Sequence, residues 1–171
     1  MRRITLFLPA SLAATLLLAL PAAASGQGVA GTSGDWSFAS DGTVAEASVD
    51  NADGATLGIV CAENCLAYVA SPRACREGAV YAATIQSTIG NFPVRMTCRR
   101  VDERYVLAMV PDATFLDTTG QCAEIAFSVV LDGSEPTLLR FSLAGAYHAI
   151  YLTLAMGMLN SAPEGGPAPS S

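Results

Sequence analysis

The five cysteines are the residues with the most definite chemistry in this chain. They stand at Cys61, Cys65, Cys75, Cys98 and Cys122. In an oxidising compartment, cysteines of a small domain pair as disulfides. Because five is an odd number, at least one cysteine is free or pairs with another chain, and spacing alone does not choose among the pairings.

Cys61 and Cys65 enclose only three residues, Ala62-Glu63-Asn64. A redox motif has two intervening residues, and a zinc site needs further ligands that this chain does not offer at suitable spacing. The last position of a three-residue hairpin loop commonly takes a left-handed conformation, which Asn64 tolerates. We therefore predict a structural disulfide across a hairpin, one more bridge among the other three cysteines, and no metal site.

Catalytic side chains do not assemble into a recognisable set. The single histidine, His148, stands between Tyr147 and Ala149 in the most apolar segment, where we expect a structural side chain bonded to a nearby carbonyl. Asp112 and Asp117 flank a predicted loop, and nothing in the pattern opposes them across a cleft as a glycosidase requires. The sequence thus predicts no catalytic residue, no cofactor and no enzymatic activity.

Basic residues gather in one stretch, at Arg95, Arg99, Arg100 and Arg104. The alternation of a strand places Arg95 and Arg99 on one face. Two guanidinium groups there would hold a carboxylate or phosphate of a partner. The alternative is a solvated face whose arginines pair with neighbouring carboxylates. We retain the four arginines as the candidate contact with a partner or an anion, and both interpretations stay open.

The first residues have the order of an export signal. Arg2 and Arg3 precede an apolar run that ends at Pro21, and the small residues 22–24 follow. This order predicts a cleaved signal peptide over 1–24. All nine basic residues are arginine, and alanine is abundant, as in proteins of GC-rich bacteria. We therefore expect a periplasmic or secreted bacterial protein.

Composition divides the rest of the chain. Residues 25–34 and 161–171 are rich in Gly, Ser and Pro, and we predict a flexible lead-in and a disordered tail. Between them, 35–160 predicts a single β-rich domain. The net charge is −6, which argues against nucleic acid as a partner.

A period of two dominates 45–143, with turn signals between short apolar runs. Only Ala144–Leu159 has helical spacing, and it carries no charge. We predict an antiparallel β-sandwich or barrel with this segment as one C-terminal helix. Because Gly145 and Gly157 interrupt the segment and no charges flank it, we expect a core or interface helix without stable membrane insertion.

Several of these features occur together in one known family. They are Trp36 soon after the signal, short strands with scattered cysteines, and Phe141-Ser142-Leu143-Ala144-Gly145 followed by Ala149. Over most of 35–156 the layout resembles the invasion-associated locus B family of small exported bacterial proteins. The resemblance implies a β-sandwich protein of the periplasm or cell surface, linked with host-cell invasion in some bacteria. It supplies no catalytic residue.

These observations favour an exported, non-enzymatic binding protein of the bacterial envelope with a role in host interaction or invasion. We expect a protein partner, whose identity the sequence does not indicate. The alternative is a small periplasmic enzyme inhibitor, in which the acidic domain meets a basic target such as a lysozyme.

Overall fold

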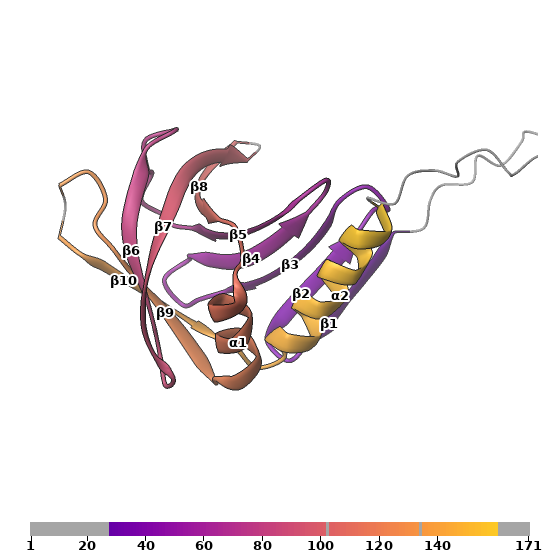
Figure 1. Ribbon diagram of the computed structural model, residues 1–171. Helices are drawn as coiled ribbons and strands as arrows, with labels where there is room; N and C mark the ends of the chain where they lie inside the picture. Colours follow the sequence, from indigo (N-terminus) through magenta and orange to yellow (C-terminus); the bar gives the residue numbers. More distant parts are fainter. Residues whose placement is uncertain (1–27, 102, 134, 161–171) are drawn as a thin grey trace, which may run out of the picture.

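The computed structural model describes residues 28–101, 103–133 and 135–160, and the predicted signal peptide 1–24 and tail 161–171 lie outside these ranges. Within them the chain forms ten strands and two helices (Figure 1). The strands are β1 (Val29–Ser33), β2 (Trp36–Ser40), β3 (Ala45–Asp50), β4 (Thr56–Cys61), β5 (Cys65–Ala70), β6 (Val80–Ser87), β7 (Gly90–Val101), β8 (Arg104–Met109), β9 (Glu124–Val129) and β10 (Thr137–Ser142). The helices are α1 (Ala113–Gln121) and α2 (Ala146–Asn160).

All ten described strands belong to one antiparallel sheet in the order β1-β2-β3-β4-β5-β8-β7-β6-β9-β10. The sheet curves so that β6, β7, β9 and β10 face the strands from β2 to β5, but β1 and β10 do not pair and the sheet stays open (Figure 1). The predicted antiparallel β architecture with a C-terminal helix is therefore confirmed, in the form of one open, strongly curved sheet.

The core fills the concave side of the sheet. Alternating residues of β3, such as Ala45, Ala47 and Val49, are buried there, as the period of two predicted. Phe127 and Phe141 meet edge to face with ring centroids 6.3 Å apart. The largest fully buried side chains are Trp36, Phe115, Phe127, Phe141, Leu57 and Ile59. Aromatic side chains from both ends of the sheet thus share one core.

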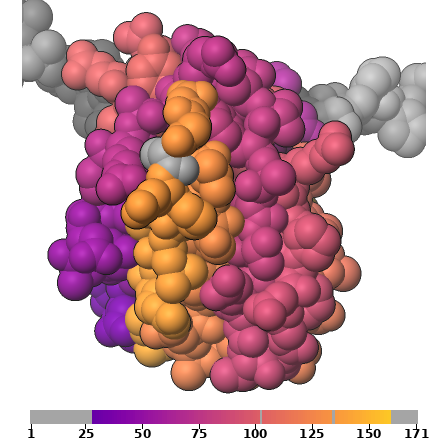
Figure 2. Space-filling model, turned by 90° about the vertical axis from the view of Figure 1, so that its left-hand side faces the viewer, coloured from indigo at the N-terminus to yellow at the C-terminus, as the bar shows by residue number. Residues whose placement is uncertain are grey.

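The two ends of the sheet meet at a junction formed by 33–36 and 142–145. Trp36 Nε1 donates to the Ser142 carbonyl at 3.0 Å, and the Asp35 N–H donates to the Ala144 carbonyl at 2.9 Å. Figure 2 shows the orange surface of β9 and β10 beside the purple surface of the N-terminal strands. Direct hydrogen bonds therefore connect β2 to the end of β10 although the sheet is not closed.

The folded part begins earlier than predicted. Residues 25–34 were expected to be a flexible lead-in, yet β1 occupies Val29–Ser33 and pairs with β2 from Val29↔Ser40 to Ser33↔Trp36. Gly34, with φ +56°, makes the tight turn between the two strands. Gly, Ser and Ala in β1 give no apolar alternation, so the partner strand and not local composition determines this element.

A second unpredicted element is α1, which replaces the expected loop between Asp112 and Asp117. The Asp112 side chain caps the helix by accepting from the Phe115 N–H at 2.9 Å. Phe115 is fully buried, which anchors the short helix to the core. Thr118, Thr119 and Gly120 are weak helix formers, so tertiary packing rather than propensity holds α1.

Helix α2 starts two residues after the predicted start and packs against β1 to β4 (Figure 1). Gly157 lies so close to β4 that a Cβ there would be 2.5 Å from the Cys61 Cβ. The opposite side, with Tyr147, Tyr151 and Met158, is exposed. None of the described helices has the length and apolar character needed to cross a membrane.

Two disulfides crosslink the sheet. Cys61 and Cys65 are bonded across the β4–β5 hairpin, with their Cα atoms 4.1 Å apart. Of the pairings that the sequence left open, the structure joins Cys75 to Cys98 and leaves Cys122 as a buried free thiol. The Thr88 hydroxyl donates to the Cys122 sulfur, and this hydrogen bond lowers the pKa of the thiol.

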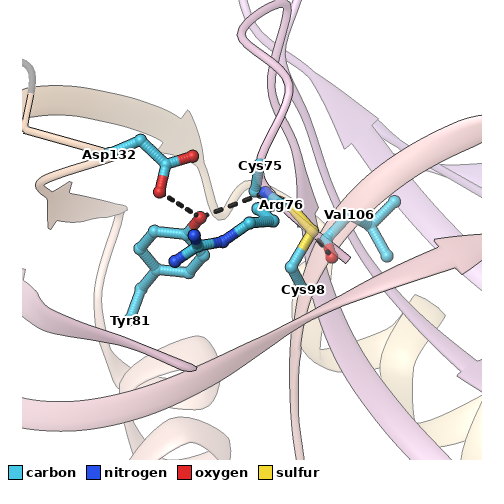
Figure 3. Close-up of a disulfide and its surroundings, with 6 residues drawn as sticks. All are labelled: Cys75, Arg76, Tyr81, Cys98, Val106 and Asp132. Atoms are coloured by element: carbon cyan, nitrogen blue, oxygen red, sulfur yellow. Dashed lines mark hydrogen bonds between the residues drawn. A yellow bond between two sulfur atoms is a disulfide. The ribbon is translucent and has the colours of Figure 1, made fainter. Parts of the chain in front are cut away.

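A buried tyrosine ties the Cys75–Cys98 bridge to the β9–β10 loop (Figure 3). The Tyr81 hydroxyl donates to Asp132 Oδ1 and accepts from the Arg76 N–H, both at 3.0 Å. Asp132 has φ +40°, a conformation that a non-glycine residue rarely adopts. The tyrosine therefore joins the segment before β6 to a strained turn at Asp132, which lies 51 residues after Tyr81 in the chain.

We expect Tyr81→Phe to lower the free energy of unfolding by about 1 kcal/mol, because it removes two part-buried hydrogen bonds whose other partners, on Arg76 and Asp132, are on exposed residues. Urea unfolding of the oxidised protein measures the change. Tyr105→Phe is the matched control, since the Tyr105 side chain is exposed, and it is expected to shift stability by less than about 0.5 kcal/mol. Equal stability of the two variants would contradict a structural role for the Tyr81 hydroxyl.

Candidate functional site

A small hollow lies on the outer face of the sheet, opposite the core. Its apolar floor consists of Val60, Ala70, Val106 and Ala108, which cluster apart from the main core. The registers explain this cluster, because Ala70 pairs with Val106 and Tyr68 pairs with Ala108 across β5 and β8. The hollow has a volume of about 80 Å³, enough for one side chain or a few waters.

Tyr68 forms one wall of the hollow because Gly58 stands opposite it in the β4–β5 pair. A Cβ at position 58 would lie 2.6 Å from the Tyr68 ring, so only glycine lets the ring lie flat on β4. In this position the Tyr68 hydroxyl donates to Glu46 Oε1 on β3. Burial, together with this hydrogen bond, raises the pKa of Tyr68 well above its usual value. Tyr68 is therefore a neutral donor whose proton is already engaged.

Arg99 and Arg104 line the hollow on the side of β7 and β8. Arg99 pairs with Val106 and Val101 pairs with Arg104, so the two arginines emerge from neighbouring strands. Among the described residues, neither guanidinium is joined to a carboxylate by an ion pair. Two cationic groups thus stand beside an apolar floor, and the Glu46 carboxylate lines the same hollow without forming an ion pair with either of them.

The four arginines predicted as one contact do not all reach this place. Arg95 is exposed on the same face of β7 as Arg99 but does not line the hollow, and Arg100 points to the other face of the strand. The structure therefore brings together Arg99 and Arg104 and separates them from the other two. His148 is exposed on α2, and no carbonyl partner for it is found within the described part of the chain.

Glu46 and Tyr68 belong to the hollow but were not among the residues singled out from the sequence. A signal for Tyr68 exists, because a hairpin closed by Cys61 and Cys65 places Gly58 opposite Tyr68. A glycine facing an aromatic residue across two strands indicates a ring lying over the glycine. Glu46 has no comparable signal, since its position beside Tyr68 depends on the register of β3 against β4.

The described lining of the hollow offers two guanidinium groups, the Glu46 carboxylate and an apolar floor, and it contains no serine, cysteine or histidine. No cluster of His, Cys, Asp or Glu suited to a metal ion occurs among the described residues. Two guanidinium groups offer bidentate hydrogen bonds to a carboxylate or phosphate, and the floor accepts methyl or methylene groups. The arrangement can hold an anionic group that carries an apolar neighbour.

Comparison with known proteins gives one informative result. No protein-family model matches the chain, and no curated protein matches it. Among solved structures, the crystal structure of invasion associated protein B from Bartonella henselae is similar, with a TM-score of 0.57 and 14% sequence identity. The match covers 76% of this chain and 99% of that chain. The resemblance predicted from the sequence is therefore confirmed at the level of the fold, which this chain shares with the invasion associated protein.

Proposed function

We propose that this chain is an exported, non-enzymatic binding protein of the bacterial envelope and that it contacts a partner protein through the outer-face hollow. The observation that carries the proposal is the pair Arg99 and Arg104, which stands beside an apolar floor and forms no ion pair with a carboxylate of the described residues. Arginine beside apolar surface is typical of the centre of protein interfaces. The small volume suits one acidic side chain of the partner.

Two further observations support an exported protein. The N-terminal residues have the order of a signal peptide, and the described cysteines form two disulfides, which persist in oxidising compartments. We further propose a role in host-cell invasion, which is supported by the name of the structural neighbour, an invasion associated protein. The alternative, an inhibitor of a basic hydrolase, gains no support from the hollow, because two guanidinium groups would repel a basic partner.

Site-specific photocrosslinking of the full chain, produced in its own host bacterium, tests the proposal. A photoreactive residue at Val101, which is exposed and lines the hollow, is expected to crosslink one protein. Val80 is the matched control, because it is equally a strand valine, is exposed and lies away from the hollow. Reversing both charges with Arg99→Glu and Arg104→Glu should abolish the crosslink. Equal crosslinking at Val80, or a crosslink that survives the charge reversal, would refute the proposal.

A further inference from the structure

A larger groove runs between α1 and α2 and ends at the hollow. Its wide part, of about 650 Å³, is lined by Leu66, Val110 and Met158 among others, and its narrow part, of about 150 Å³, is lined by Tyr147 and Tyr151. Leu116 and Leu154 line both parts, so the two parts adjoin at these side chains. Its size is in the range of sites for small ligands, about 300–1,000 Å³.

Several large apolar side chains of the groove are exposed. On α2, residues Tyr147, Tyr151, Leu154 and Met158 follow one another at intervals of four, three and four, which places them along one stripe of the helix. Met158 is 73% exposed and Tyr151 is 61% exposed, and Val110, which lines the wide part together with Met158, is 75% exposed. A contiguous apolar stripe of this kind marks a surface that binds something.

Charge is confined to one end of this groove. Among its described lining residues, Arg99 is the only charged side chain, and it stands where the groove meets the hollow. Arg104 lines the hollow on the same side and adds a second positive charge at this end. Glu46, the one acidic side chain in the described lining of the hollow, does not line the groove. The complementary ligand is therefore apolar along its length and anionic at one end.

We propose that the groove binds a single-chain anionic amphiphile, with its phosphate or carboxylate head on Arg99 and its alkyl chain between α1 and α2. An extended peptide fits less well, because its backbone N–H and C=O groups would need partners that two helices with satisfied backbones do not supply. An alkyl chain brings no such groups. This inference goes beyond the proposed function, because the alkyl chain lies in the groove between the helices, and the two occupants would compete for Arg99.

Titration calorimetry of the exported protein with octyl, decyl and dodecyl phosphate, each below its micelle concentration, tests the inference. Affinity should rise with chain length, by at most about fourfold for each added methylene. Inorganic phosphate should show no measurable binding. Arg99→Gln should weaken binding about tenfold at every chain length. Met158→Gln with Val110→Asn should reduce the gain per methylene, and both side chains are exposed, so the fold is kept.

Two matched controls accompany these variants. Arg95→Gln removes an exposed arginine from the same face of β7, and Val80→Asn removes an exposed apolar side chain from β6, so both should leave binding unchanged.

Equal binding of dodecyltrimethylammonium, or an affinity independent of chain length, would overturn the inference. An acidic peptide that displaces dodecyl phosphate and binds more tightly would also overturn it and assign the groove to a protein. If Val101 gives no crosslink but alkyl phosphates still bind, the proposed function is refuted and the inference of a groove for an amphiphile stands.

Discussion

Replacing Gly145 by alanine is expected to lower the free energy of unfolding by about 3 kcal/mol or more. Gly145 has φ +87°, which costs an alanine about 1–2 kcal/mol. A Cβ there would also overlap the Ser33 carbonyl oxygen and approach the Gly34 nitrogen at 2.7 Å. Both of these atoms belong to the backbone, so the junction itself must move, at a further cost of about 1–3 kcal/mol. Urea unfolding measures the loss.

Gly54→Ala separates the two causes. Gly54 has a similar φ, +75°, but nothing lies within 4 Å of a Cβ built on it. Its replacement should therefore cost only the conformational strain, about 1–2 kcal/mol. If the two variants lose the same stability, the close approach of the two backbones at the junction does not contribute, and our account of how the sheet ends are joined is wrong.

Removal of the Cys75–Cys98 bridge should be comparably damaging. The bond closes a loop over a sequence separation of 23, and the chain-entropy relation for such a loop gives about 3 kcal/mol. Both cysteines are buried, at 6% and 1% exposure, so Cys75→Ala with Cys98→Ala also loses packing. Chemical unfolding of the double variant, compared with the oxidised parent protein, measures the total.

Cys61→Ala with Cys65→Ala is the matched comparison, since its bond spans a sequence separation of only four. The same relation gives about 2 kcal/mol for this loop. The Cys75–Cys98 variant should therefore unfold at a lower urea concentration than the Cys61–Cys65 variant. The reverse order would show that the hairpin bridge supports α2, which contacts it through Gly157, more strongly than loop entropy accounts for.

The parts of the fold that the sequence predicts are those with local signals. Alternation in β3 and the spacing of Cys61 and Cys65 define the hairpins β3–β4 and β4–β5, because residues close together in the sequence determine the register of these pairs. The apolar run ending at Leu159 defines α2 in the same way. β1 and α1 have no such signal, since one depends on a partner strand and the other on the burial of Phe115.

The candidate site shows the same division. Strand alternation predicts that Arg95 and Arg99 share a face, and the structure has them so. Which of them meets the apolar floor depends on the order β5-β8-β7, where β8 returns between two strands that precede it in the chain. No local pattern contains that order. Arg104 joins Arg99 only because the start of β8 pairs with the end of β7, where Val101 stands opposite Arg104.

The junction between the sheet ends has a consequence for the order of folding. Trp36 and Ser142 are 106 residues apart in sequence, whereas the hairpins β3–β4, β4–β5 and β6–β7 join residues that are close together. Closing a long loop costs entropy before its contacts form, so short-range hairpins form early and distant contacts late. We expect the contacts of Trp36 with β10 to be absent from the folding transition state. Weakening them should therefore accelerate unfolding while leaving the folding rate nearly unchanged.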